Sequence, residues 1–164
     1  MQTTAERHEA RGARRAIPWR RVLHVALRLV LGLTLLGMAT GTALDIPGFR
    51  DVLRGYDVFP GWALWPIAIV LPVSEAFGAV TLLTGWRLRT GIGVSSLLQA
   101  GWAALLMLAL RRGVEIHNVG WFGVFWAQPL SWTGPLAALA LLAISAGVLV
   151  TLPSGPVWRC STGG

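Results

Sequence analysis

Three polar side chains lie inside long apolar stretches of this sequence and are its best candidates for chemistry: Arg28, Glu75 and Gln99. An ionisable group inside a bilayer costs about 2.5–3.5 kcal/mol on insertion scales, so it normally faces neighbouring helices and has a partner. Helical rise places Glu75 roughly 14 Å, Gln99 roughly 12 Å and Arg28 roughly 9 Å from the cytoplasmic ends of their stretches. We therefore predict that the three share one layer of a helical bundle, where Arg28 pairs with Glu75. Gln99 and Ser74 are expected to assist this pair.

Three interpretations of this intramembrane polar cluster remain open. It could be a structural clasp that fixes the order of the helices, or a site for a proton or the headgroup of a quinone. In the third interpretation, Arg28 extends alone to the membrane surface and Glu75 is protonated. The cluster is thus a candidate site for which the sequence names no ligand.

A second candidate site is the aromatic segment RRGVEIHNVGWFGVFWAQPLSW, residues 111–132. Its aromatic side chains could form a surface for a protein partner or for stacking a quinone, although aromatic residues beside a membrane also serve as interfacial anchors. His117 and Glu115 lack a clear third ligand, so we expect no metal site and a locally hydrogen-bonded histidine. We also find no nucleophile–base constellation and predict no catalytic residue. The residues proposed for this surface are His117, Trp121, Phe122, Phe125 and Trp126.

Four apolar stretches must position these side chains. Apolar residues make up 54% of the 164 residues and charged residues only 13%, too few to coat a soluble core of this size. Each stretch approaches the about 20 residues that a bilayer core requires, so the fold class is an all-α, polytopic four-helix bundle with the lipid bilayer as its surroundings. The predicted spans are residues 22–44, 62–84, 91–110 and 134–152.

The 14 arginines set the orientation, since the sequence contains no lysine. They flank apolar stretches instead of forming a nucleic-acid-binding patch. Apart from Arg28, which lies within a span, nine would lie inside and four outside if both termini are cytoplasmic, as the excess of basic residues on the inner side requires. Residues 1–21 form a predicted disordered basic tail, and residues 153–164 a C-terminal tail with the single cysteine, Cys160. The spacing of FRDVLRGY predicts a short helix on the outer surface.

The order of these features resembles the MauE/DoxX family of four-span bacterial membrane proteins. The likeness covers about residues 25–150 and includes RLVLG, GFRDVLRGYDVFP, LPVSEAFGAVTLLTGW, RRGVEIHNVGWFG and PLSW. It implies a multi-pass protein of the bacterial plasma membrane whose two outer loops face the exported side. Redox-related members carry Cys-Gly-Cys in the second outer loop, where this chain has Val119, Gly120 and Trp121. The resemblance therefore implies a loop of similar shape that lacks the two thiols and their chemistry.

Three functions are compatible with these observations. The resemblance implies a non-enzymatic accessory protein that helps an exported or membrane-bound redox partner to mature or assemble, as in the methylamine-utilisation branch. The alternative is a quinone-interacting subunit of a membrane oxidoreductase, which would make quinone the one cofactor to expect. A small transporter is the third, although the four spans show no internal repeat of the kind common in transporters.

Overall fold

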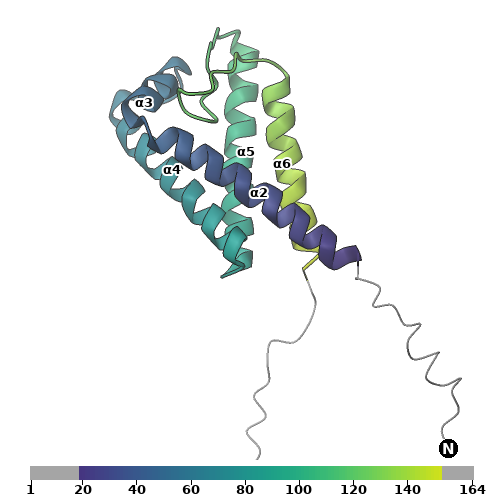
Figure 1. Ribbon diagram of the computed structural model, residues 1–164. Coiled ribbons are helices and arrows are strands. Elements are labelled where there is room, and N and C mark those ends of the chain that lie inside the picture. The colour runs from purple at the N-terminus through teal and green to yellow at the C-terminus, as the bar shows by residue number, and fades with distance from the viewer. Residues whose placement is uncertain (1–18, 153–164) are drawn as a thin grey trace, which may run out of the picture.

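The computed structural model describes residues 19–152, which form five α-helices and their connections. Four long helices, α2 (Trp19–Ala43), α4 (Gly61–Thr84), α5 (Leu88–Arg112) and α6 (Thr133–Val150), form a bundle in which α2 crosses obliquely (Figure 1). The short α3 (Ile46–Gly55) lies at one end, which we call the outer end. Residues 19–152 contain no strand, and all four long helices are apolar and long enough to span a membrane. The predicted all-α fold with four spans is thus confirmed.

The ends of the helices follow from local chemistry. The α3 helix begins where the Asp45 carboxylate accepts a hydrogen bond of 2.9 Å from the backbone N–H of Gly48, as an N-cap residue does. The helices α4 and α5 end at Gly85 and Gly113, whose φ angles of 78° and 65° are left-handed. Glycine adopts this conformation without the penalty that a Cβ would bring. Predicted and observed ends of the spans differ by at most three residues.

Small residues set the spacing between neighbouring helices. A Cβ added to Gly32 of α2 would lie 2.8 Å from the Leu83 side chain of α4, and one added to Gly91 of α5 would overlap the Thr81 hydroxyl. Close approach of this kind is how helices pack in lipid, where no hydrophobic force drives them together. Large apolar side chains cover the outside of the bundle, for example Val70 and Leu97, which are 61% and 75% exposed.

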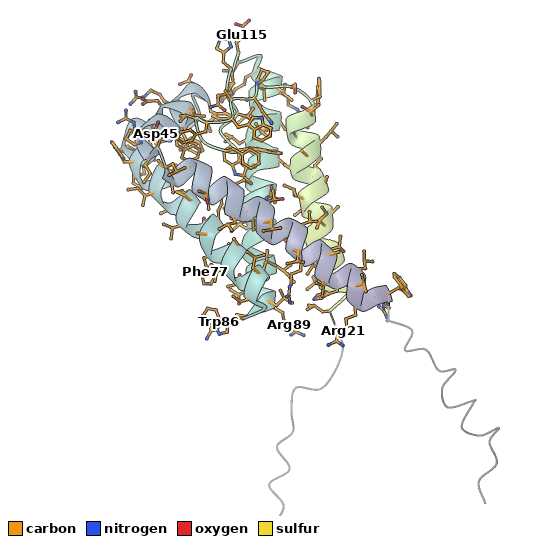
Figure 2. All side chains as sticks on the ribbon, viewed as in Figure 1. Arg21, Asp45, Phe77, Trp86, Arg89 and Glu115 are labelled. Atoms are coloured by element: carbon orange, nitrogen blue, oxygen red, sulfur yellow. The ribbon has the colours of Figure 1, made fainter. Side chains whose placement is uncertain are left out.

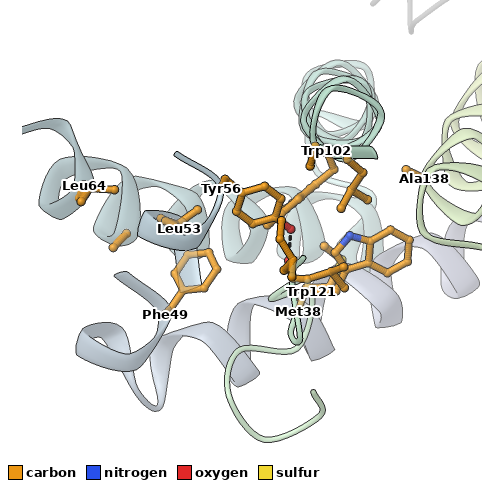
Figure 3. Packing of buried hydrophobic residues seen from close by; sticks show 13 residues of the cluster. Met38, Phe49, Leu53, Tyr56, Leu64, Trp102, Trp121 and Ala138 are labelled. Atoms are coloured by element: carbon orange, nitrogen blue, oxygen red, sulfur yellow. Dashed lines mark hydrogen bonds between the residues drawn. The ribbon is translucent and has the colours of Figure 1, made fainter. Parts of the chain in front are cut away.

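Two apolar clusters fill the interior. One surrounds Leu31, Leu82 and Val148 in the half of the bundle away from α3. The other lies at the outer end, where residues of α3 meet side chains of α5 and of the loop 113–132 (Figure 3). The outer cluster reaches Trp102 in the middle of α5. It therefore extends from α3 into the part of the bundle that spans the membrane.

Charged side chains gather at the two ends of the bundle. Figure 2 shows Arg21, Arg89 and Trp86 at one end and Asp45 and Glu115 at the other. The start of α2 and the end of α6 lie at the arginine-rich end (Figure 1). The placement of this end in the cytoplasm stays a prediction from the arginine distribution. The predicted N-terminal tail is too long by three residues, because residues 19–21 belong to α2. The rest of this tail, residues 1–18, and the C-terminal tail, residues 153–164 with Cys160, lie outside the described residues.

Candidate functional site

Thr42 of α2, Glu75 of α4 and Trp102 of α5 meet inside the bundle, and Gln99 is buried one turn before Trp102 on α5. We call these four residues the middle polar layer. Thr42, Glu75 and Gln99 are fully buried, and Trp102 is 3% exposed. The Trp102 indole and the Thr42 hydroxyl lie beside the Glu75 carboxyl. Gln99 lies one turn before Trp102 on the same face of α5, because residues three apart on a helix are neighbours.

Five side-chain atoms of this layer form no close hydrogen bond within the described chain. Both carboxyl oxygens of Glu75, both amide atoms of Gln99 and the indole nitrogen of Trp102 are buried and unpartnered. The Thr42 hydroxyl donates instead to the carbonyls of Met38 and Ala39 in its own helix, at 2.9 and 3.2 Å. Each buried group without a partner costs roughly 1–3 kcal/mol, and native structures contain few of them.

The predicted ion pair between Arg28 and Glu75 is wrong. Among the described residues the ion pairs are those of Asp51 with Arg50 and Arg54, on α3. The Arg28 guanidinium lies against Gly85, where a Cβ would be 3.0 Å from its Nη1. That position is the C-terminal end of α4, whose free carbonyls attract a cation. Arg28 therefore extends toward the membrane surface, as one of the three interpretations anticipated.

Ser74 also does not assist Glu75 in the way we predicted. Its hydroxyl donates a 2.8 Å hydrogen bond to the carbonyl of Leu71 in the same helix. The polar contacts that join helices are elsewhere. The hydroxyls of Ser95 and Ser145 link α5 to α6 at 3.3 Å, and His24 Nδ1 lies 3.0 Å from the Thr151 hydroxyl. These two contacts join helices without Arg28 or Ser74.

A groove of about 530 Å³ extends from Leu53 of α3 and from Val58 and Phe59, which follow α3, to Trp102 of the middle polar layer. It runs between α4 and α5 and is lined almost entirely by apolar side chains. Trp102 belongs both to the groove and to the layer. The other lining residues are Leu53, Val58, Phe59, Ile67, Leu71, Leu97, Leu98, Gly101, Ala104, Leu105 and Leu108.

The outer loop closes over the bundle and is held there by specific contacts. The hydroxyl of Tyr56 donates a 2.7 Å hydrogen bond to the carbonyl of Val119 (Figure 3), and burial raises the Tyr56 pKa well above its usual range. The Asn118 side chain donates to the carbonyl of Gly123 and accepts from the N–H of Gly120, both at 2.9 Å. We call Tyr56 and residues 118–123 the outer cap.

The loop divides the predicted aromatic surface into two parts. Trp121 is only 8% exposed and packs in the outer cluster, so its assignment to a partner surface is wrong. Phe122 is half-buried against Gly37 of α2. Phe125 and Trp126 are 66% and 64% exposed, and the Trp126 ring lies 5.7 Å from that of Phe122.

His117 is exposed at the outer end, beside Glu115. A small hollow there is lined by His117, Glu115 and neighbouring apolar residues such as Ile116 and Leu130. Within residues 19–152 no group of three potential ligands is placed to hold a metal ion. The exposed loop surface therefore offers aromatic contact area, and no described side chains form a metal centre there.

Sequence reasoning missed Trp102, Thr42 and Tyr56. Trp102 has an apolar ring, so its place in a polar layer could have been predicted only from its spacing of three residues after Gln99. Thr42 lies near the end of a predicted span and gave no signal. Tyr56 is the single tyrosine in the chain, and a buried tyrosine hydroxyl usually finds a partner.

Comparisons with known proteins agree with this architecture. The family model described as methylamine utilisation protein MauE matches residues 20–153. The methylamine utilization protein MauE of Paracoccus denitrificans is 33% identical over 130 residues, which are 79% of this chain and 69% of that relative. No solved structure matches the chain. With most of its length matched by the family model and by this relative, the chain belongs to the MauE family.

Proposed function

We propose that this chain is an integral membrane accessory protein of methylamine utilisation, which helps an exported or membrane-bound redox partner to mature or assemble. Support comes from the family and from the relative in Paracoccus denitrificans, a methylamine utilization protein by name. The bacterial plasma membrane is the setting for this proposal, and the outer cap faces the exported side.

The exposed aromatic edge beside the outer cap is the observation that carries this proposal. Phe125 and Trp126 stand 66% and 64% exposed beside a loop that Tyr56 and Asn118 hold in place. Aromatic side chains are enriched in protein interfaces, where they provide large contact areas. A rigid loop binds at a lower entropic cost than a mobile one. This surface suits a protein partner at the outer face.

The mode of assistance follows from the residue types of the outer cap. Where redox-related family members carry two thiols, this chain has Val119 and Trp121, which are 3% and 8% exposed. Neither side chain can exchange a disulfide. The proposed role is therefore to bind and position the partner, with any thiol chemistry supplied by another protein.

Removal and replacement of the gene in its host would test this role. Without the gene, methylamine-dependent growth and the amount of mature redox partner should both fall, and the wild-type chain should restore them. The double variant Phe125→Ala/Trp126→Ala should restore them poorly. The matched control is Trp62→Ala, since Trp62 is an 81% exposed tryptophan at the start of α4. Full restoration by the double variant, or equal loss with the control, would contradict the proposed docking surface.

The orientation can be tested with the single cysteine. A membrane-impermeant maleimide should label Cys160 only after the membrane is opened, because the predicted C-terminus is cytoplasmic. Labelling in intact cells would reverse the orientation and place the outer cap on the cytoplasmic side. In that case an exported partner could not reach Phe125 and Trp126.

A further inference from the structure

The apolar groove and the middle polar layer are two parts of one continuous surface. On α4, Leu71 lines the groove and Glu75 lies one turn below it on the same face. On α5, Leu98 and Trp102 line the groove, and Gln99 lies between them in sequence. The groove also includes Leu97, which is 75% exposed on the outside of the bundle. A molecule in the surrounding lipid could therefore enter between α4 and α5 and reach the unpartnered polar atoms.

We propose that this surface binds a lipid-soluble molecule with an uncharged, carbonyl- or hydroxyl-bearing headgroup on a hydrocarbon tail, the chemical class to which quinones belong. The headgroup would lie against Trp102 and Gln99, and the tail would lie in the groove. This inference concerns a site in the membrane-embedded part of the bundle. It does not depend on partner docking at the outer cap.

The polar atoms of the layer indicate the headgroup. The indole N–H of Trp102 lies beside the Glu75 carboxyl but forms no close hydrogen bond to it, and both amide atoms of Gln99 lack partners. A carbonyl or hydroxyl oxygen satisfies such donors. An anionic headgroup would face the Glu75 carboxyl without a cation, because Arg28 lies against Gly85 at the end of α4. A cationic headgroup would have to leave water for an apolar groove, which is costly at this depth.

The groove indicates the tail. Its volume of about 530 Å³ falls within the range of about 300–1,000 Å³ that is usual for small-molecule sites. Gly101 faces this space, and a Cβ added there would meet no atom within 4 Å. Water could satisfy the polar layer and an acyl chain of the surrounding lipid could fill the groove, whereas one molecule with a polar headgroup and a hydrocarbon tail would do both.

Binding of two matched probes to the full chain in lipid nanodiscs would test the site. One probe is a benzoquinone with a decyl chain, and the other is benzene with the same chain. The wild-type protein should bind the quinone about tenfold more tightly, the effect of roughly one additional hydrogen bond to a buried group. Equal affinity for the two probes would mean that water alone satisfies the layer, and it would overturn the proposal.

Two glycines of α5 provide a matched pair of variants for the groove. Gly101→Leu fills the groove and should weaken binding of both probes by about tenfold or more. Gly93→Leu adds the same side chain to the same helix outside the groove, where a Cβ also meets no atom within 4 Å, and should leave binding unchanged. Unchanged binding to Gly101→Leu, or equal loss with Gly93→Leu, would contradict the assigned tail site.

Gln99→Leu tests the headgroup end separately. It should abolish the preference for the quinone and leave the affinity for the benzene probe near that of the wild type. If the double variant Gln99→Leu/Trp102→Phe still binds the quinone more tightly than the benzene probe, neither donor contacts the headgroup. That result would overturn the assigned headgroup site. The unfolding temperature of each variant shows that the compared proteins are folded.

Discussion

The outer cap and the middle polar layer contain buried or half-buried polar side chains in opposite situations. In the cap, the Tyr56 hydroxyl and the Asn118 amide have partners at 2.7 and 2.9 Å, and the Trp121 indole nitrogen is the exception. In the middle polar layer, Glu75, Gln99 and Trp102 have no partner among the described residues. Burial of a polar residue therefore does not by itself mark a functional site here. The unpartnered atoms gather in the middle polar layer, and the exceptions among the described residues are Trp121 Nε1 and Arg28 Nε.

Gly123→Ala should cause the largest change, because it disrupts the outer cap. Gly123 has a left-handed φ of 64°, and an added Cβ would overlap the carbonyl oxygen of Gly41. Left-handed strain and a backbone clash together should destabilise the fold by roughly 2–4 kcal/mol. Gly55→Ala is the control, since a Cβ there meets no atom within 4 Å. If both variants unfold in detergent at the wild-type temperature, the cap is not closed as described.

Gln99→Leu should instead increase the free energy of unfolding of the ligand-free protein by roughly 1–3 kcal/mol, because it removes buried polar atoms that lack partners. Ser145→Ala should instead destabilise the protein by about 0.6 kcal/mol, since it breaks the contact with Ser95. Unfolding free energies in mixed micelles measure both changes. A marked loss of stability in Gln99→Leu would show that Gln99 is a clasp like Ser145, and the contrast between the two kinds of polar group would fail.

Tyr56→Phe should destabilise the protein by about 1 kcal/mol, the usual worth of one intramolecular hydrogen bond. The phenyl ring keeps its place in the outer cluster, so the loss should appear mainly in the loop 113–132. Limited proteolysis would detect faster cleavage of this loop, while the long helices remain protected. Cleavage at the wild-type rate would mean that the bond to Val119 does not hold the cap closed.

The smallest effect near neutral pH should be the change in the protein's stability that comes from ionisation of Tyr56. Burial raises the pKa of Tyr56, so the folded protein holds the phenol proton more tightly than the unfolded chain does. Stability should therefore be constant below the ordinary tyrosine pKa of about 10 and should fall as the pH rises beyond it. Tyr56 is the single tyrosine, so its phenolate absorbance reports this titration directly. Ionisation near the ordinary tyrosine pKa in the folded protein would contradict the buried environment.

The sequence predicts the elements of this fold better than their contacts. Long apolar stretches identify the spans because hydrocarbon requires them, and the spacing of FRDVLRGY predicted the short helix α3. Position along a helix gives the depth of a residue but not the direction in which its side chain points. The predicted depths of Arg28 and Glu75 therefore suggested a pair, but Glu75 lies beside Thr42 and Arg28 lies beside Gly85, at different levels of the bundle. Packing of Gly32 against Leu83 and the end of α4 at Gly85 decide where Arg28 lies, and neither could be predicted from composition.

The aromatic loop shows the same limit. Its composition predicted an aromatic surface in the second outer loop, but five aromatic or histidine positions looked equivalent in the sequence. The left-handed glycines Gly120 and Gly123 turn the chain so that Trp121 is buried while Phe125 and Trp126 are exposed. Such a division depends on backbone conformation, which residue type alone does not specify.

An experimental structure of the full chain, purified with its native lipids, would test the central claim most directly. We expect an elongated molecule in the groove between α4 and α5, with a polar headgroup within hydrogen-bonding distance of the Trp102 indole and the Gln99 amide. A structure in which Glu75, Gln99 and Trp102 bond only to one another, with the groove closed by the chain's own side chains, would contradict it.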